Sequence, residues 1–257
     1  MYLQQVTKWP NSTFSKTNQC NLSPFSIQGH VRAVKAFWSW LADEGYIDNN
    51  PLAKFPLPKV PKTLINTLTI NQLKQLLSQL DKSTPIGVRF YCLLLLLIDT
   101  GMRISEAVSI RLENINLPKG YVKVVGKGQK ERLVPFTKEL KKELIKYTNH
   151  FRNNLCKSES PYLFPTKDGE HITVNGVQQA IRRLAEKASF QGVKCHPHIF
   201  RHTFATYFIA KGGGETALQN ILGHESMQTT RKYIHLQPSD LKKQHDKYSP
   251  LTDLFGY

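Results

Sequence analysis

The chain has 257 residues, with 35 Lys or Arg against 19 Asp or Glu, and therefore a formal net charge of +16. This length suffices for one large hydrophobic core, or for one core plus a smaller module. So large a basic excess argues against a generic cytosolic enzyme and favours a polyanionic partner, although charge alone leaves a basic surface without such a role as an alternative.

The first predicted element is a helix that follows Ser26 and ends before Gly45 and the Asn49-Asn50-Pro51 stop. Its apolar residues recur at alternating spacings of four and three, which predicts one buried stripe on a helix. These residues are Ile27, Val31, Val34, Trp38 and Leu41.

A proline-rich segment with two lysines follows, from Pro51 to Pro61. Each proline withholds a backbone donor and disfavours helix at the residue before it, so this segment is expected to be extended. The sequence Thr69-Ile70-Asn71-Gln72 is a capping box that opens the next helix. We therefore divide the chain into a small all-α module (1–58), a linker (59–66) and a larger domain (67–257).

The larger domain is predicted to be mainly helical, with one β interruption. The expected helices cover 69–80, 85–98, 103–110, 137–150, 173–189, 199–211 and 215–222. Between them, 121–125 and 132–136 flank a glycine-containing turn, which is the signature of a hairpin. The fold class is thus mainly α with a small antiparallel β-sheet, an α+β arrangement.

The cysteines and the apolar segments of the sequence indicate the redox environment and whether the chain crosses a membrane. The four cysteines are far apart and form no CxxC pair, so we expect no disulfide scaffold and a reducing, intracellular environment. They are Cys20, Cys92, Cys156 and Cys195. The apolar run 88–98 is too short to cross a bilayer and is predicted to be a buried helix. Cys195-His196-Pro197-His198 lacks a second half with ligand spacing, so we expect no metal site.

Four motifs carry residues suited to attack on a phosphodiester: TGMRISE, GKGQKERLVPF, HPHIFRHTFAT and LGHESMQTTRKY. Negative charge grows on the phosphate oxygens in the transition state, and fixed arginines can meet it. A lysine can also give up a proton, which makes Lys127 in the hairpin turn a candidate general acid. Taken singly, each residue has a structural explanation. Arg103 can simply follow a helix cap, Arg201 can be solvated, and Tyr233 can be a packing residue.

Together and in this order, the four motifs closely resemble the tyrosine recombinases, the phage integrase and Xer-type family. The resemblance implies that Arg103 and Arg201 clamp the scissile phosphate and that Lys127 protonates the leaving 5′ oxygen. It implies that His198 assists proton transfer, that His224 hydrogen-bonds a phosphate oxygen, and that Tyr233 attacks to form a 3′-phosphotyrosine. Glu106, one turn after Arg103, is expected to orient that arginine.

The resemblance also implies the partners. It predicts a double-stranded DNA recombination site, a homo-tetramer on synapsed DNA that is a monomer or weak oligomer when free, no membrane association and a cytoplasmic, nucleoid-associated location. Neither metal nor ATP is needed, because the phosphotyrosine stores the bond energy, so no cofactor is expected. Further candidates for DNA contact are His30, Arg32, Lys35, Lys130 and Arg132.

Residues 1–58 correspond to the core-binding domain of this family but are shorter than usual, either naturally or because the chain starts inside a longer reading frame. After Tyr233, Leu251, Leu254 and Phe255 are apolar anchors in a tail. Family members often dock such a tail on a neighbouring protomer, and the sequence permits either that or docking on its own chain.

Two alternatives share parts of this pattern. A type IB topoisomerase uses similar chemistry but lets the cut strand swivel, and a catalytically silent DNA-binding protein can share the scaffold. The wording of GKGQKERLVPF and TGMRISE is nearer the recombinases, and the presence of all six chemical residues argues against a silent scaffold.

Overall fold

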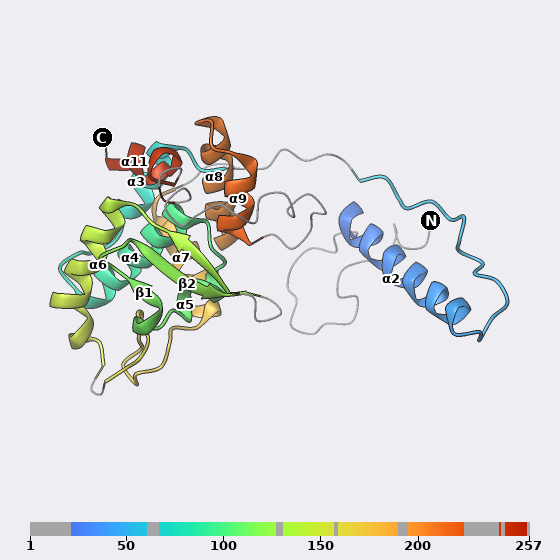
Figure 1. Ribbon diagram of the computed structural model, residues 1–257, viewed down its shortest axis with the longest axis horizontal. Coiled ribbons are helices and arrows are strands. Elements are labelled where there is room, and N and C mark those ends of the chain that lie inside the picture. Colours follow the sequence, from blue (N-terminus) through green and yellow to red (C-terminus); the bar gives the residue numbers. More distant parts are fainter. Residues whose placement is uncertain are drawn as a thin grey trace. The chain divides into compact units, whose positions relative to one another are not determined.

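The computed structural model (Figure 1) describes residues 22–60, 67–126, 131–156, 159–189, 195–223, 242 and 245–255. The predicted residues Lys127, Lys130, His224 and Tyr233 lie outside these ranges. The chain divides into two compact units, 1–64 and 65–257, and each is described by itself.

The first unit contains helix α2 (Pro24–Asp43). Ser23 caps it through a hydrogen bond from the Ser26 backbone, and Pro24 occupies its first turn, so the helix begins before the predicted position after Ser26. The segment after the helix is bound to it, since Lys35 Nζ donates to the carbonyl oxygen of Leu52 at 2.8 Å and Gln28 donates to that of Pro58 at 2.8 Å.

The apolar stripe of α2 is less buried than predicted. No described residue of this helix is buried, and Val34 is 48% exposed. Phe37 and Trp40, which lie outside the predicted stripe, are also exposed, and their rings stack with centroids 6.0 Å apart. The prediction of a buried stripe was wrong for the described part of this unit, where a turn and an extended segment pack against α2 instead of a second helix.

The second unit holds the remaining described elements. Its helices are α3 (Ile70–Ser78), α4 (Pro85–Thr100), α5 (Ile104–Val108), η1 (Leu112–Asn114), α6 (Lys138–His150), η3 (Arg152–Asn154), α7 (Val174–Lys187), α8 (Pro197–Ala210), α9 (Glu215–Leu222) and α11 (Pro250–Phe255). Its strands are β1 (Ile115–Asn116), β2 (Tyr121–Val125) and β3 (Glu131–Pro135). The predicted fold class, mainly α with a small antiparallel sheet, is confirmed.

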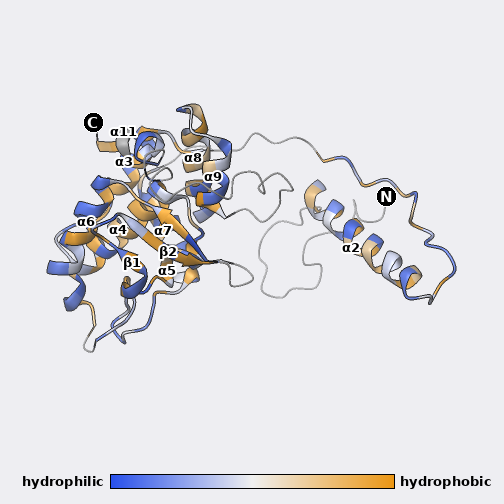
Figure 2. Ribbon diagram, in the orientation of Figure 1, coloured by the Kyte–Doolittle hydropathy of each residue, from blue (hydrophilic) through white to orange (hydrophobic). Residues whose placement is uncertain are grey.

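Helix α4 is the centre of the core. All of its residues from Leu93 to Thr100 are buried, which confirms the interpretation of the apolar run as a core helix. It packs against α6, α8 and α11. Its neighbour α6 is coloured mostly hydrophilic in Figure 2, whereas β2 is largely hydrophobic. Burying a helix on several sides requires apolar residues around its whole circumference, as this sequence provides.

The sheet is antiparallel with strand order β1-β2-β3. The predicted hairpin is confirmed, with β3 one residue earlier than the predicted 132–136, and it pairs Val124 with Arg132 and Val125 with Glu131. Strand β1 was not predicted, because two residues are too few to show a period. Val122, Val124 and Val134 are buried, and because side chains alternate along a strand, Arg132 lies on this same inner face.

The end of the chain packs on this unit. Leu251 is fully buried and Leu254 nearly so, and α11 contacts α3, α4, α6 and α8 of its own chain. Just before α11, the buried Ser249 hydroxyl donates to the Asp99 carboxylate near the end of α4. The described part of the tail therefore completes the core of the same chain. No described helix is both long and apolar enough to cross a membrane.

Candidate active site

Arg103 is presented by a tight turn between two helices. Gly101 ends α4 in the left-handed conformation at φ 60°, and a Cβ there would lie 2.6 Å from the Phe204 ring. Arg103 then caps α5 with extended backbone, and its side chain remains 39% exposed. The TG pair of the TGMRISE motif thus serves to place this arginine at the surface of the core.

Glu106, predicted to orient Arg103, is hydrogen-bonded to it. Its carboxylate accepts from the Arg103 backbone N–H at 2.8 Å and from Arg103 Nη1 at 3.1 Å. Burial opposes ionisation of this carboxyl, but the hydrogen bonds and charge of Arg132, together with the hydrogen bonds from Arg103, outweigh it, so the pKa of Glu106 lies below its ordinary value. Glu106 is therefore a carboxylate at neutral pH.

Arg201 lies on the first turns of α8, with Pro197 at the helix start. It is only 8% exposed. Its Nη1 donates to the Gly101 carbonyl at 3.0 Å and its Nη2 to the Leu222 carbonyl at 2.8 Å. Burial, with a further contribution from the nearby charge of Arg103, lowers the pKa of Arg201 to about 10, which leaves it cationic at neutral pH.

Arg132 was not predicted to be part of this cluster. It reaches in from β3 and its guanidinium donates to both oxygens of Glu106, at 2.9 and 2.8 Å. Its Nε donates to the Ile221 carbonyl at 2.9 Å, and its side chain is 13% exposed. No sequence signal could have found this pair, because its members come from two separate motifs.

His198 is exposed and precedes Arg201 by three residues on α8, so the two side chains share one side of the helix. His196 and His202 are its exposed neighbours. Burial lowers the pKa of both His196 and His202, and the charge of His198 lowers each further. The neutral forms of His196 and His202 are therefore favoured.

Four elements meet at this place. Arg103 comes from the start of α5, Arg132 from β3 and Arg201 from α8, and two of them bind the last carbonyls of α9. Gly223 ends α9 in the left-handed conformation at φ 65°, and a Cβ there would lie 3.0 Å from the Arg132 side chain. The next residue in the sequence is His224, which is outside the described ranges.

The predicted DNA contacts of the first unit stay predictions. His30 and Arg32 are exposed on α2. Lys35 binds the carbonyl oxygens of Leu52, Ala53 and Phe55. Its ammonium is thus engaged within its own unit.

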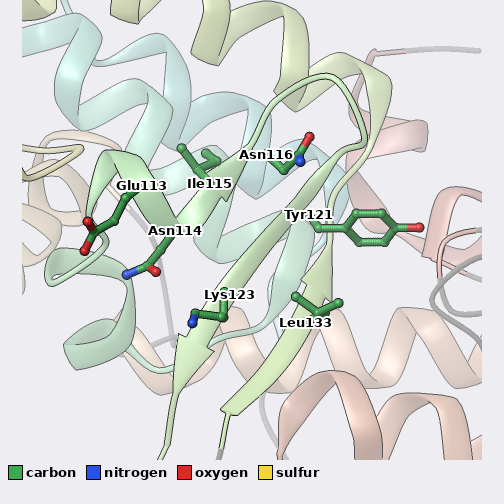
Figure 3. A pocket seen from close by; sticks show the side chains of 7 residues that line it. All are labelled: Glu113, Asn114, Ile115, Asn116, Tyr121, Lys123 and Leu133. Atoms are coloured by element: carbon green, nitrogen blue, oxygen red, sulfur yellow. The ribbon is translucent and has the colours of Figure 1, made fainter.

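A separate hollow lies on the outer face of the sheet, opposite the face that carries Arg132 (Figure 3). Its lining is Glu113, Asn114, Ile115, Asn116, Tyr121, Lys123 and Leu133. It includes none of the predicted catalytic residues. Among the described residues, no three His, Cys, Asp or Glu side chains gather in a way that could hold a metal ion.

Comparison with known proteins identifies the family. Residues 66–240 match the model described as "Phage integrase family". The chain belongs to this family. It is 34% identical over 232 residues to tyrosine recombinase XerC of Oceanobacillus iheyensis, covering 89% of this chain and 76% of the relative. It is 29% identical over 230 residues to tyrosine recombinase XerD of Listeria monocytogenes, covering 89% and 77%.

Solved structures agree on the fold. A XerH site-specific recombinase bound to a palindromic difH substrate aligns with a TM-score of 0.66 at 20% identity, over 86% of this chain and 67% of that one. The tyrosine recombinase assignment made from the four motifs is confirmed. The protein is a site-specific recombinase that cleaves and rejoins DNA, which decides against the topoisomerase and the silent scaffold.

Proposed function

We propose that this recombinase cleaves one strand of a specific duplex site through Tyr233 and that Arg103 and Arg201 hold the scissile phosphate. The observation that carries this proposal is the meeting of the two arginines. They are far apart in sequence, yet Arg201 binds the carbonyl of Gly101, two residues before Arg103. Arg103 keeps a partly exposed guanidinium, as an anion clamp requires.

The chemical step is a displacement at phosphorus. The phenol oxygen of Tyr233 attacks, forming the Tyr–O–P bond at the 3′ side, while the P–O5′ bond breaks. The phenol proton passes toward His198, and Lys127 supplies a proton to the departing 5′ oxygen. The free phenol has a pKa near about 10 and is a poor nucleophile at neutral pH, so neighbouring cations must favour its anion. Rejoining is the same step in reverse by the hydroxyl of a partner strand.

Arg103 and Arg201 both fit this role energetically. The negative charge on the phosphate oxygens increases as the nucleophile approaches, and donors fixed beforehand need no reorganisation at that moment. Arg201 is fixed by two backbone carbonyls and Arg103 by Glu106. His224 is proposed to add a further hydrogen bond to the same phosphate.

We further propose the partners and the domain roles. Residues 1–58 form a short DNA-binding domain that uses His30 and Arg32, residues 59–66 a linker, and residues 67–257 the catalytic domain. The substrate is duplex DNA with a specific site, by analogy with the XerH recombinase, which was solved bound to its difH substrate. Synapsis of two sites is proposed to use a homo-tetramer in the bacterial cytoplasm, next to the nucleoid.

Covalent capture of DNA tests the proposal. The wild-type protein is incubated with nicked genomic fragments, denatured in detergent, and the covalently retained DNA is sequenced to define the site. Detergent-stable complexes with one junction sequence are expected for the wild type and none for Tyr233→Phe. Tyr162→Phe, which removes a phenol outside the proposed site, is the matched control and should behave as wild type. Equal capture by Tyr233→Phe and wild type would contradict the assignment of the nucleophile.

A further inference from the structure

Arg132 and Glu106 form a two-point ion pair inside the arginine cluster. Both terminal nitrogens of Arg132 donate to the two carboxylate oxygens, at 2.9 and 2.8 Å. The exposed fraction is 13% for the Arg132 side chain and 6% for that of Glu106. Parallel contacts of this kind are directional as well as strong, and a lysine cannot reproduce them.

Glu106 divides its hydrogen bonds between two arginines with different surroundings. Arg132 takes both oxygens from the β3 side, whereas Arg103 gives a single side-chain N–H, at 3.1 Å, together with its backbone N–H. The Arg103 side chain is 39% exposed, three times the fraction of Arg132. The more buried Arg132 therefore neutralises the carboxylate, and Arg103, with one side-chain hydrogen bond to it, remains partly exposed to solvent.

We propose that Arg132 is a positioning residue for DNA cleavage, which occupies Glu106 so that Arg103 stays available to the phosphate. Without Arg132, one carboxylate faces Arg103 alone, and the Arg103 guanidinium can close on it with two hydrogen bonds. Glu106 then competes with the phosphate for the same donors. This inference rests on the proposed function of Arg103 as a phosphate clamp.

A second contact extends the role of Arg132 beyond charge. Its Nε donates to the Ile221 carbonyl at 2.9 Å, and Gly223 leaves room for its side chain. Arg201 binds the neighbouring Leu222 carbonyl at 2.8 Å. The last carbonyls of a helix lack partners within it, so these two arginines together fix the end of α9. Arg132 thus joins β3, which begins four residues after Lys127 in the sequence, to α9, which ends two residues before His224.

The geometry favours this role over direct DNA contact. The charge of Arg132 is already met by the Glu106 carboxylate, which accepts from both of its terminal nitrogens, whereas Arg201 gives its described hydrogen bonds to two neutral carbonyl oxygens. A residue that positions the site should affect the cleavage rate more than DNA affinity. A residue that binds a phosphate should instead change the salt dependence of affinity.

The experiment is a double-variant cycle of Arg132→Met and Glu106→Gln, with single-turnover cleavage rates measured at saturating DNA on the captured site. Arg132→Met should slow cleavage by about 100-fold, with DNA affinity within about threefold of wild type. Adding Glu106→Gln should restore about tenfold of the lost rate, because the competing carboxylate is gone. Arg132→Lys, which keeps the charge but not the fork, should fall between wild type and Arg132→Met.

Controls separate this inference from the function on which it rests. Arg182→Met removes an arginine from an exposed pair with Glu186 and should leave cleavage unchanged. Thermal unfolding establishes that each variant is folded at the assay temperature. Failure of the wild type to capture DNA would refute the proposed function itself. With an active wild type, the absence of recovery in the double variant overturns the role of Arg132, and so does a salt slope for Arg132→Met that is lower by about one.

Discussion

Two buried carboxylates stand close together in the sequence, and the fold uses them differently. Glu106 is bound by the guanidinium groups of Arg103 and Arg132. Asp99 is fully buried and accepts from the Thr137 backbone N–H at 2.8 Å and from the Ser249 hydroxyl. The first carboxylate is paired with two arginines at the edge of the site, and the second with amide and hydroxyl donors and the buried His245 in the core.

The pKa values of the two carboxyl groups are shifted in opposite directions. Burial raises the pKa of Asp99, although the charge of His245 and the hydrogen bonds from Ser249 and Thr137 act to lower it. For Glu106 the arginines outweigh burial and its pKa is lowered. A carboxylate that shares hydrogen bonds with cations organises a charged site, whereas one held by hydroxyl and amide donors joins segments of the fold. Asp99 joins α4, the residue before α6 and the tail.

The largest expected effect comes from removing the charge of each carboxylate in turn. Glu106→Gln should slow cleavage by about tenfold and lower the free energy of unfolding by about 3 kcal/mol, because Arg103 and Arg132 then lack their carboxylate. Asp99→Asn should lower the free energy of unfolding by about 1–3 kcal/mol, while its cleavage rate stays within about threefold of wild type. Chemical denaturation and single-turnover cleavage measure both. A cleavage defect of equal size in Asp99→Asn would remove the distinction between the two carboxylates.

The pH dependence of stability should have opposite signs at the two positions. The folded-state pKa of Glu106 is lowered, so its contribution is present above its ordinary pKa and is lost as the pH falls through the folded value. The advantage of wild type over Glu106→Gln should therefore shrink between about pH 6 and about pH 3.

For Asp99 the folded-state pKa is raised, so its contribution is present at low pH and is lost as the pH rises through the folded value. The advantage of wild type over Asp99→Asn should grow over the same descent in pH. Urea unfolding of the wild type and both variants at several pH values measures these slopes. Parallel slopes for the two variants would show that the carboxylates titrate alike.

The smallest effect is expected at the end of α9. Gly223→Ala should lower the free energy of unfolding by about 1–2 kcal/mol, because alanine is strained in the left-handed backbone conformation. The new Cβ should also displace the Arg132 side chain, so cleavage should slow severalfold. Gly212→Ala is the matched control, since Gly212 has φ 82° but its nearest neighbour, Tyr248, would be 3.8 Å from the new Cβ. Gly212→Ala should lower the free energy of unfolding as Gly223→Ala does, but it should cleave at the wild-type rate. If both variants cleave alike, contact with Arg132 is not what Gly223 provides.

The sequence predicted well those features that depend on local pattern. The apolar run identified α4, the glycine turn identified the hairpin, and the capping box at Thr69 was found as predicted. Helix boundaries were less accurate where proline or a short turn decides them. Helix α8 begins at Pro197 instead of 199, and α5 covers only Ile104–Val108 of the predicted 103–110.

The features that depend on distant partners could not be predicted. Arg132 was predicted only as a candidate for DNA contact. Its ion pair with Glu106 was not predicted, because nothing in GKGQKERLVPF indicates that Glu106 lies within reach. The junction of Asp99 with Ser249 joins residues 150 apart in the sequence, and neither lies in a recognisable motif. The spacing of apolar residues predicted helix α2 correctly. It could not show that the rest of the described unit leaves these residues only partly buried or exposed.

A substrate with a neutral scissile phosphate tests most directly whether Arg201 meets negative charge on that phosphate. Wild type and Arg201→Ala are compared on the captured site with its ordinary phosphate and with a methylphosphonate at the scissile position, which lacks one negative oxygen. Arg201→Ala should lose about 100-fold or more on the phosphate and recover most of that loss on the methylphosphonate. An equal loss on both substrates would contradict the account, because Arg201 would then act without reference to the phosphate charge.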